Sequence, residues 1–516
     1  MRVGIIFVFM DFHRKGRKYH GVLQPLIGPL VAGLLPDDIE IEVVNDTWED
    51  PHWDRDYDLL FITGMHSDFD RMRQISHYWR RRGAKTVLGG TLASTYPELC
   101  QPFFDAIVVG DAEGSVPEVY RDFLAGELQP IYVSAAYDPA KVPVPRFDLL
   151  AGKQMIPLSF ECTRGCPFTC EFCALTGIGT RHHVRPVETV LRDIREGQRR
   201  LRGLVPWYKL NVVGFLDNNL GGNPGYLRQL CAALEPLGLI WGSGITFNVL
   251  ADEGMVETLS RAGCRAMFMG LESLNPATLK DMHKYQNTVA EARRVLDLCR
   301  KHGILVESPL MLSPVTDDLD YIRSIPDRLR ECGLHLPTFL CIESPIPGTP
   351  HFHRLAAEDA AFLPNALLRD FNGYTLVTRP KLETVEDFAQ GYAWVVENTY
   401  TWKARAARLR QNVPEFLRRG FFFPALADVR DNLIHTQKPH PDRTYVAGSD
   451  VPFPEATSVP LTDDDFDSEE ERQAIMEPWR LTDEEGRVLP AWRQSIKVFE
   501  GKGRISAAAR QLVAVA

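Results

Sequence analysis

The sequence predicts an α/β protein built in three parts: an N-terminal Rossmann-like open parallel sheet, a partial (β/α)6 TIM-like barrel, and a mainly helical C-terminal region. Short apolar runs alternate with amphipathic stretches in two separate series, which is the pattern of βα units. A proline-bearing connector, AYDPAKVPVPRFDLL, separates the two series, and the alternation weakens beyond about Leu355. These changes predict domains over residues 1–140, 150–355 and 356–516.

The first series runs from Arg2 to about Tyr132, with strand-like segments VGIIFVF, IEIEVV, LLFITG, TVLGG and AIVVG. Four of these are followed by polar or glycine-rich segments, namely DFHRKG, TGMHSD, GGT and GDAEG. Open α/β sheets bind their ligands at the carboxyl ends of the strands. We therefore expect a cofactor on this edge, where the candidate contacts are Ser67, Gly89, Gly90, Asp111 and Glu113.

The second series carries six strand-like segments, PLSFECTRG, KLNVVGFLD, IWGSGITF, AMFMGLES, ILVESPLML and HLPTFLCIESP. Helices are expected between them, near residues 187–201, 226–237, 255–261, 290–302 and 322–331. Six βα units are fewer than the eight of a closed barrel. The prediction is therefore an open, partial barrel.

The C-terminal region is predicted to contain helices over residues 385–398 and 402–412, followed by an acidic stretch, LTDDDFDSEEERQ, that suits a solvated loop or helix start. Its aromatic residues are expected to form the core of this region, and the alternative is that they line a pocket for a lipid or a tetrapyrrole. They are Phe421, Phe422, Phe423, Trp479 and Trp492. A substrate-binding or capping role is expected for the region.

The composition argues against several classes of protein. The chain has 516 residues with a formal net charge of -10, which disfavours broad binding to nucleic acid. No window near twenty residues is free of charge or proline, so no transmembrane segment is expected. The chain opens on a strand-like segment without a basic region and a small-residue cleavage site, and a cytoplasmic location is expected.

The ten cysteines are distributed unevenly. Six lie singly in apolar or helical contexts, where a small buried hydrophobe is the expected role; they are Cys100, Cys231, Cys264, Cys299, Cys332 and Cys341. The other four fall within ECTRGCPFTCEFCAL, residues 161–175. An all-cysteine zinc site is one interpretation of this cluster, although structural zinc usually pairs two short knuckles across a longer loop.

Cys166, Cys170 and Cys173 form a C-x3-C-x2-C motif after the first predicted barrel strand. If they bind three irons of a 4Fe-4S cluster, the fourth iron lacks a protein ligand and stays open to a small molecule. Cys162 does not fit this spacing; a buried small residue is expected there, and a redox or substrate-facing thiol is the alternative. In a partial barrel this motif resembles the radical S-adenosylmethionine superfamily. The resemblance implies that S-adenosylmethionine (SAM) occupies the open iron and is cleaved by one electron to a 5'-deoxyadenosyl radical.

The same resemblance assigns roles to residues at other strand ends. Asp217 and Asn218, in GFLDNN, lie where the family places groups that meet the methionyl amino end of SAM, while a helix N-cap is the alternative for Asn218. Glu272, in GLES, is implied to lie near the ribose or the amino acid part, because an ionised carboxylate ending an apolar strand needs a partner. Phe172 and Met311 resemble adenine contacts; the alternatives are a cover over the cluster for Phe172 and a core position for Met311.

At the end of the first strand, Asp11, His13 and Gly16 satisfy D-x-H-x-x-G and resemble the cobalamin-binding loop of methionine synthase and the cobalamin mutases. The resemblance implies that His13 ligates cobalt and that Asp11 hydrogen-bonds its other ring nitrogen. A basic stretch, RKYHG, follows where those families enter a helix, and a surface histidine is the alternative. The wider segment, with glycines at 89, 90, 110 and 114, resembles the cobalamin-binding domain fused to radical enzymes, where glycine lets the backbone approach a bulky corrin.

With ESLNPATLKDMHKYQN, SPIPGTP and DFNGYTLVTRPKLETVEDFAQGYAW, residues 1 to about 410 resemble the cobalamin-dependent radical enzymes that include hopanoid methylases and the anaerobic magnesium-protoporphyrin ester cyclase. The resemblance implies a methyltransferase that alkylates an unactivated carbon of a small molecule, such as a lipid, a tetrapyrrole or a natural-product intermediate. It also implies an electron donor such as flavodoxin or ferredoxin. The alternatives are ring formation or oxidation without methyl transfer, and a sensor or carrier whose cluster is structural.

Overall fold

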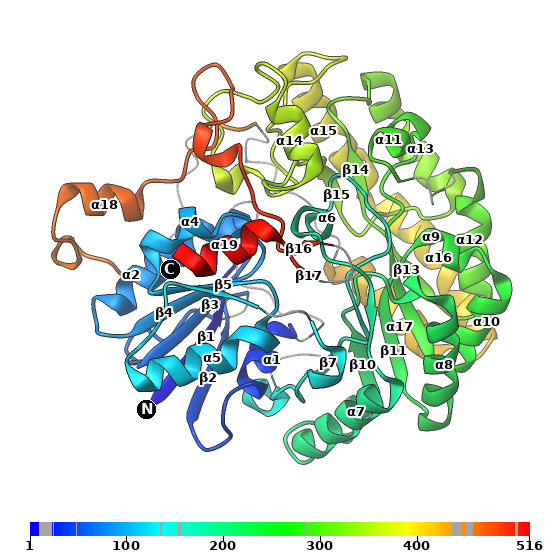
Figure 1. The fold of residues 1–516 in the computed structure, drawn as a ribbon. Coiled ribbons are helices and arrows are strands. Elements are labelled where there is room, and N and C mark those ends of the chain that lie inside the picture. Colours follow the sequence, from blue (N-terminus) through cyan, green and yellow to red (C-terminus); the bar gives the residue numbers. More distant parts are fainter. Residues whose placement is uncertain are drawn as a thin grey trace.

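The computed structural model describes residues 1–9, 23, 25–47, 49–134, 137–152, 156–284, 287, 289–435, 446–448, 458–500 and 504–515. The chain folds as two parallel α/β units that lie side by side, and the C-terminal region extends over both of them (Figure 1). The predicted α/β class with parallel sheets is confirmed.

The N-terminal sheet has six parallel strands in the order β2-β1-β3-β4-β5-β6. They are β1 (Arg2–Phe7), β2 (Glu40–Asn45), β3 (Leu59–Thr63), β4 (Lys85–Gly89), β5 (Ala106–Val109) and β6 (Ile131–Val133). Helices α1 (Ile27–Gly33) and α5 (Ala112–Ala125) cover one face, and α2 (Phe69–Arg80), α3 (Thr91–Thr95) and α4 (Pro97–Cys100) cover the other. The strand order reverses between β1 and β3, and sheets of this kind bind ligands at the carboxyl side of such a switch point.

The second sheet has five parallel strands in the order β13-β12-β11-β10-β7. They are β7 (Leu158–Phe160), β10 (Val212–Phe215), β11 (Ile240–Ile245), β12 (Cys264–Met269) and β13 (Leu305–Glu307). Strands β14 (Leu310–Leu312) and β15 (Leu340–Ile342) form a separate parallel pair. The fifth predicted strand is therefore split between β13 and β14. Pro309 lies at the break, where it has no N–H to donate to a neighbouring strand.

The helices of the second unit pack against the outer face of its sheet and bury one contiguous core. The longer ones are α7 (Val187–Leu201), α8 (Pro224–Leu234), α10 (Glu253–Arg261), α12 (Ala292–Lys301) and α13 (Leu319–Cys332). Shorter helices α9 (Phe247–Leu250) and α11 (Pro276–Asp281) follow the carboxyl ends of β11 and β12. These helices therefore share their core with one face of the sheet.

The C-terminal region contains the two helices predicted for it, α15 (Val385–Thr399) and α16 (Trp402–Arg418). It also contains α14 (Pro350–Ala356), α17 (Phe422–Arg430), α18 (Glu469–Met476), β16 (Phe499–Glu500), β17 (Arg504–Ile505) and α19 (Ala507–Val515). The last part of the chain returns to the N-terminal sheet, where α18 packs on α2 and α19 packs on β6 (Figure 1).

The expectation of a separate aromatic C-terminal core is wrong for its two tryptophans. The ring of Trp479 lies 4.8 Å from that of Phe69 on α2, and the ring of Trp492 lies 5.1 Å from that of Tyr96. Both tryptophans belong to the core of the N-terminal sheet, because the chain that carries them crosses back over α2 to α4. Phe422, in contrast, is 72% exposed.

Five of the six single cysteines are buried as expected, and Cys341 is half-buried. None of the helices in the described ranges combines the length and the apolar character that crossing a bilayer requires.

Candidate functional site

The loop that carries the predicted cluster ligands follows β7 and leads into α6 (Ala174–Ile178). Cys170 is buried, whereas Cys166 and Cys173 are half-buried. Burial raises the pKa of the Cys173 thiol; the neighbouring thiols of Cys170 and Cys166 raise it further, and the N–H groups of Leu175 and Thr176 in the first turn of α6 lower it. The thiols of Cys170 and Cys166 are therefore close enough to Cys173 to act on it electrostatically.

Cys162 stands apart from this group. Its side chain is fully buried, and burial raises the pKa of its thiol well above the usual range, with Cys231 as the neighbouring thiol. Its carbonyl oxygen accepts the N–H of Arg185 at 2.9 Å and the hydroxyl of Tyr226 at 3.2 Å. The buried position expected for Cys162 is confirmed.

The cysteine loop offers three thiols as donors. In the part of the chain that the structure describes, no three His, Cys, Asp or Glu side chains gather closely enough to hold one metal ion. A 4Fe-4S cluster takes one thiolate per iron, so its ligands stand around the cube instead of meeting at one point. Three neighbouring thiols in one loop have the chemistry and the spacing that such a cluster needs.

The turn after β10 brings an asparagine to the cysteine loop, but it is not the predicted one. The side-chain amide of Asn219 lies 3.6 Å from Sγ of Cys166, while its oxygen accepts the N–H and the hydroxyl of Thr246, both at 3.3 Å. Asn218 is exposed, and the next helix, α8, is capped by Asn223. Sequence reasoning missed Asn219 because adjacent asparagines differ only in the direction that the turn gives them.

Asp217 fixes the start of the cysteine loop. Its Oδ1 accepts the N–H of Cys162 at 3.1 Å and the hydroxyl of Thr163 at 2.7 Å, and it also accepts the N–H of Thr163. Its Oδ2 is buried and has no hydrogen-bond partner within the described chain. Burial raises the pKa of Asp217 to about 7, against the lowering effect of the Thr163 hydrogen bonds.

Glu272 and Lys284 form a buried ion pair beside the cysteines, with 2.7 Å between Nζ and Oε1. Glu272 has a backbone φ of 66°, which is rare for a residue with a Cβ and marks stored strain. The Nζ of Lys284 lies 5.7 Å from the ring centroid of Phe172. Burial lowers the pKa of Lys284, but Glu272, Cys170 and Cys173 together outweigh this effect and raise it.

The structure thus places Phe172 and Glu272 around the ammonium group of Lys284, a residue that the sequence reasoning missed. Met311 is next to them, because its backbone N–H donates to the carbonyl of Glu272 at 2.6 Å. The only sequence signal for Lys284 is its place in ESLNPATLKDMHKYQN, after the predicted ligand Glu272.

Arg164, two residues before the first cysteine of the motif, joins the two sheets. Its guanidinium binds Glu161 at 2.7 Å, Asp111 at 2.9 Å and Glu113 at 2.8 Å, and it lies 4.2 Å from the ring centroid of Tyr137. Burial raises the pKa of Asp111 and of Glu161, although Arg164 lowers both. The two predicted cofactor contacts at the end of β5 are thus bound to the cysteine loop.

The other predicted residues of the N-terminal sheet lie at its carboxyl edge. Ser67 is buried in the 3-10 turn His66–Asp68 that follows β3, and Gly89 ends β4. Gly90 (φ 115°) and Gly110 (φ 92°) adopt conformations that favour glycine. Glycine 114 lies within α5 and is not among the residues with positive φ. Asp11, His13 and Gly16 lie outside the described residues.

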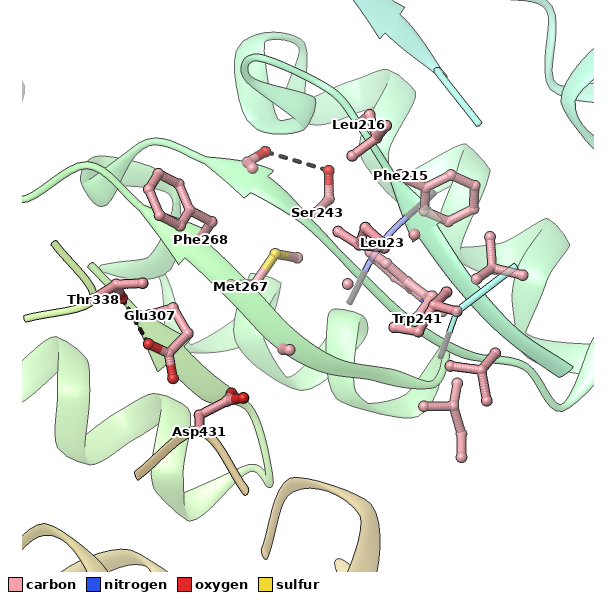
Figure 2. Close-up of a pocket in the computed structure, with 18 of the residues that line it drawn as sticks. Leu23, Phe215, Leu216, Trp241, Ser243, Met267, Phe268, Glu307, Thr338 and Asp431 are labelled. Atoms are coloured by element: carbon pink, nitrogen blue, oxygen red, sulfur yellow. Dashed lines mark hydrogen bonds between the residues drawn. The ribbon is translucent and has the colours of Figure 1, made fainter. Parts of the chain in front are cut away.

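A cavity of about 520 Å³ lies against the inner face of β10, β11 and β12. Asp217 and Gly244 line it at the carboxyl ends of β10 and β11, next to the start of the cysteine loop. Leu23, from the N-terminal unit, lines it as well, so both units contribute to this cavity (Figure 2).

Comparison with known proteins shows what this chain is similar to. Residues 160–324 match the family model described as the Radical SAM superfamily. The bacteriochlorophyllide d C-8(2)-methyltransferase of Chlorobaculum tepidum is 28% identical over 342 residues, which cover 63% of this chain and 74% of that relative. The hopanoid C-2 methylase of Rhodopseudomonas palustris is 24% identical over 64% of this chain and 63% of its own length. An anaerobic magnesium-protoporphyrin IX monomethyl ester cyclase of Rubrivivax gelatinosus is 22% identical over 72% of each chain.

Two solved structures share the fold. The radical SAM methyltransferase TsrM of Kitasatospora setae, with cobalamin and a [4Fe-4S] cluster bound, has a TM-score of 0.52 at 17% identity and covers 70% of this chain and 79% of its own. OxsB, with aqua-cobalamin and SAM bound, has a TM-score of 0.56 at 13% identity and covers 84% and 75%. The chain described here therefore carries a radical SAM domain, within a larger fold that it shares with cobalamin-dependent radical SAM enzymes.

Proposed function

We propose that this chain is a cobalamin-dependent radical SAM methyltransferase, which methylates an unactivated carbon of a small molecule through a 5'-deoxyadenosyl radical and methylcobalamin. The observation that carries the proposal is the cysteine loop: Cys173 has the thiols of Cys170 and Cys166 as neighbours, and the loop is set beside a buried lysine and bound through Arg164 to the edge of a second parallel sheet. In this assignment residues 1–140 bind cobalamin, residues 150–355 hold the cluster and SAM, and residues 356–516 contribute to substrate binding or cap the site.

The cysteine loop has the residues that a SAM-cleaving cluster needs. Cys166, Cys170 and Cys173 would hold three irons, and the fourth iron would take the amino acid part of SAM. When bound, the cluster supplies the electron that cleaves the sulfonium bond, and cobalamin supplies the methyl group. Asn219 donates an N–H toward Cys166 and so stabilises negative charge on that ligand.

Lys284 and its neighbours would orient SAM. A buried ammonium group beside two cluster cysteines attracts the SAM carboxylate, and Glu272 keeps it in place through the 2.7 Å ion pair. Asp217 Oδ2 and Asn287 Oδ1 are buried acceptors without a hydrogen-bond partner in the described ranges. Such acceptors are costly unless a donor fills them, and the ammonium and hydroxyl groups of SAM are donors.

The carboxyl edge of the N-terminal sheet would carry cobalamin. Ser67 and Gly90 follow neighbouring strands at this edge, and the predicted cobalt ligand His13 follows β1 in the sequence. Asp111 and Glu113 bind Arg164, so we assign them to positioning the sheet edge relative to the cysteine loop. Two cofactors that act on one carbon need such a fixed arrangement, because misplacement by about 1 Å costs orders of magnitude in rate.

A radical reaction without methyl transfer is the second candidate, since a cyclase is among the relatives. The product decides between the two: methylation adds one CH2 to the substrate mass, whereas cyclisation or oxidation removes hydrogen. The proposed partners are a small-molecule substrate and a one-electron donor such as flavodoxin or ferredoxin, and the proposed location is the cytoplasm.

The test is anaerobic reconstitution with iron, sulfide and hydroxocobalamin, followed by reduction in the presence of SAM. Visible absorption reports both cofactors, and the release of 5'-deoxyadenosine reports SAM cleavage. The triple variant Cys166→Ala, Cys170→Ala, Cys173→Ala is expected to lose this release. The matched control is Cys162→Ala, which removes a cysteine of the same segment and is expected to retain most of it. Retention by the triple variant, or equal loss in both proteins, would contradict the proposal.

A further inference from the structure

A cavity borders the inner face of the second sheet, where several residues are small. In closed βα barrels the inward positions carry bulky branched residues that fill the interior. Here the positions that line the cavity on β10, β11 and β12 include Gly214, Gly242, Gly244 and Ala266. Leu23 occupies the space over Gly214, where a Cβ would collide with its side chain. A Cβ on Gly242 or Gly244 would meet the backbone of Ala266 or Asp217. These small residues border a cavity of about 520 Å³, which is within the usual range of small-molecule pockets.

Large aromatic side chains also line the cavity. Phe268, on the inner face of β12, is 43% exposed, and its ring lies 6.3 Å from that of Phe339. Phe423, one of the aromatic residues of the C-terminal region, lines the cavity too. When an apolar ligand covers an aromatic ring that is exposed on the inner face of a sheet, the burial of apolar surface favours binding.

Three polar side chains gather at one end of the cavity, while Asp217 and Ser243 line it elsewhere. Figure 2 shows Glu307, Thr338 and Asp431 there, while Leu23 and Trp241 lie at the other end. Glu307 binds Arg408 at 2.5 Å and accepts the Thr338 hydroxyl at 2.6 Å.

Asp431 and Asp428 complete the charges at this end. Asp428 binds Arg408 at 2.7 Å, and Asp431 binds Arg430 at 3.1 Å. Of these charged groups, two carboxylates (Glu307 and Asp431) and one guanidinium (Arg408) line the cavity, so its lining at this end has an excess of one negative charge when all three are ionised. Carboxylates are acceptors only, and this end would therefore favour a ligand group that donates.

We infer that this cavity binds the substrate, and that the substrate is a bulky, mainly apolar molecule with a cationic or hydrogen-bond-donating group at one end. The inference rests on the proposed function, since it takes the ligand to be the molecule that is methylated. The apolar part lies along the glycine-rich wall of β10 and β11, and the donor lies at Asp431. The opposite end of the cavity then reaches Asp217 and Leu23, where the two cofactor-binding units meet.

The test uses two probes with one apolar cage and opposite charge, 1-adamantylamine and adamantane-1-carboxylate. Their affinities for the reconstituted protein are measured by isothermal titration calorimetry. We expect the amine to bind about tenfold tighter than the carboxylate, a difference of about 1.4 kcal/mol. Ala266→Phe fills the cavity and is expected to weaken amine binding about tenfold or more, and Asp431→Asn is expected to remove the preference for the amine. Leu124→Phe, on the exposed face of α5, is the control and is expected to bind as the parent protein does.

Equal affinity for the two probes would overturn the substrate class, and unchanged binding by Ala266→Phe would overturn the site. If thermal denaturation shows that Ala266→Phe is not folded at the temperature of the titration, the smaller substitution Ala266→Leu is used for the same comparison. The release of 5'-deoxyadenosine is measured on the same samples. Probe binding without that release would contradict the proposed function alone, and release without selective probe binding would contradict the substrate class alone.

Discussion

Replacing Arg164 by methionine tests whether the two sheets are held by one buried cation. The substitution keeps the length of the side chain but leaves Glu161, Asp111 and Glu113 without their guanidinium partner. Removing one partner of a buried ion pair costs about 3–5 kcal/mol. The side chain of Arg164 is 14% exposed, so water reaches part of the site. We therefore expect the free energy of unfolding to fall by an amount at the lower end of this range, about 3 kcal/mol at pH 7.5.

The sign of the pH dependence follows from the freed carboxylates. Burial already raises the pKa of Asp111 and of Glu161, and loss of Arg164 removes the group that lowers both. Carboxyl groups with raised pKa in the folded state take up protons as the pH falls, which relieves their repulsion. Urea denaturation should therefore show that Arg164→Met loses less free energy of unfolding, relative to the parent protein, at pH 5 than at pH 7.5.

The matched control for this experiment is Arg199→Met, which removes an exposed guanidinium from an ion pair with Glu196 on α7. Exposed pairs of this kind contribute little to stability, and we expect little change at either pH. If Arg164→Met is as stable as Arg199→Met at pH 7.5, or loses more stability at pH 5, the role given to Arg164 is refuted.

Two further predictions concern single side chains. Asn219→Leu removes the N–H that points at the first cluster cysteine, and we expect the cluster potential to fall by about 60 mV, because a hydrogen bond worth about 1.4 kcal/mol equals 59 mV for one electron. A redox titration followed by electron paramagnetic resonance measures this shift, and an unchanged or higher potential would contradict it. Burial lowers the pKa of His66 to about 4, against the raising effect of its hydrogen bond to a backbone carbonyl. An unfolded histidine has a pKa of about 6.5. His66 therefore lowers the free energy of unfolding by about 2 kcal/mol when the pH falls from 8 to 5. Urea denaturation at the two pH values should show that His66→Gln lacks this loss of stability. If the free energies of unfolding of His66→Gln and the parent protein differ by the same amount at both pH values, the prediction is wrong.

The strands and their order along the chain could be predicted because each is a short apolar run that ends in a polar or glycine-rich turn. The three-residue strand β6 has too few residues to show a pattern, and it forms because β5 offers it a partner. The return of the chain to the N-terminal sheet could not be predicted either. Trp479 and Trp492 are apolar in any setting, and only the tertiary structure shows which core they join.

The cysteine loop could be proposed from the sequence because its chemistry depends on local spacing, and the role of Cys166, Cys170 and Cys173 as cluster ligands stays a prediction. Lys284, Asn219 and Arg164 could not, since each acts through a partner that is distant in the sequence or selected by the direction of a turn. Arg164 meets Asp111 across 53 residues, and Asn219 meets Cys166 across the same separation. The sequence showed that Asp111 and Glu113 end a strand at a ligand-binding edge, but their binding to an arginine depends on how the two sheets are placed.

Glycine explains how closely these two edges approach. A Cβ on Gly177 of α6 would stand 2.7 Å from the carbonyl oxygen of Gly348, and one on Gly348 would stand 3.0 Å from Thr95 of α3. A Cβ on Gly179, at the end of α6, would collide with the carbonyl oxygen of Phe499. The helix α6 is therefore in close contact with the backbone at Gly348 and at Phe499, and both of these segments also touch the N-terminal unit. These backbone contacts and the ion pairs of Arg164 together fix the cysteine loop relative to the N-terminal unit.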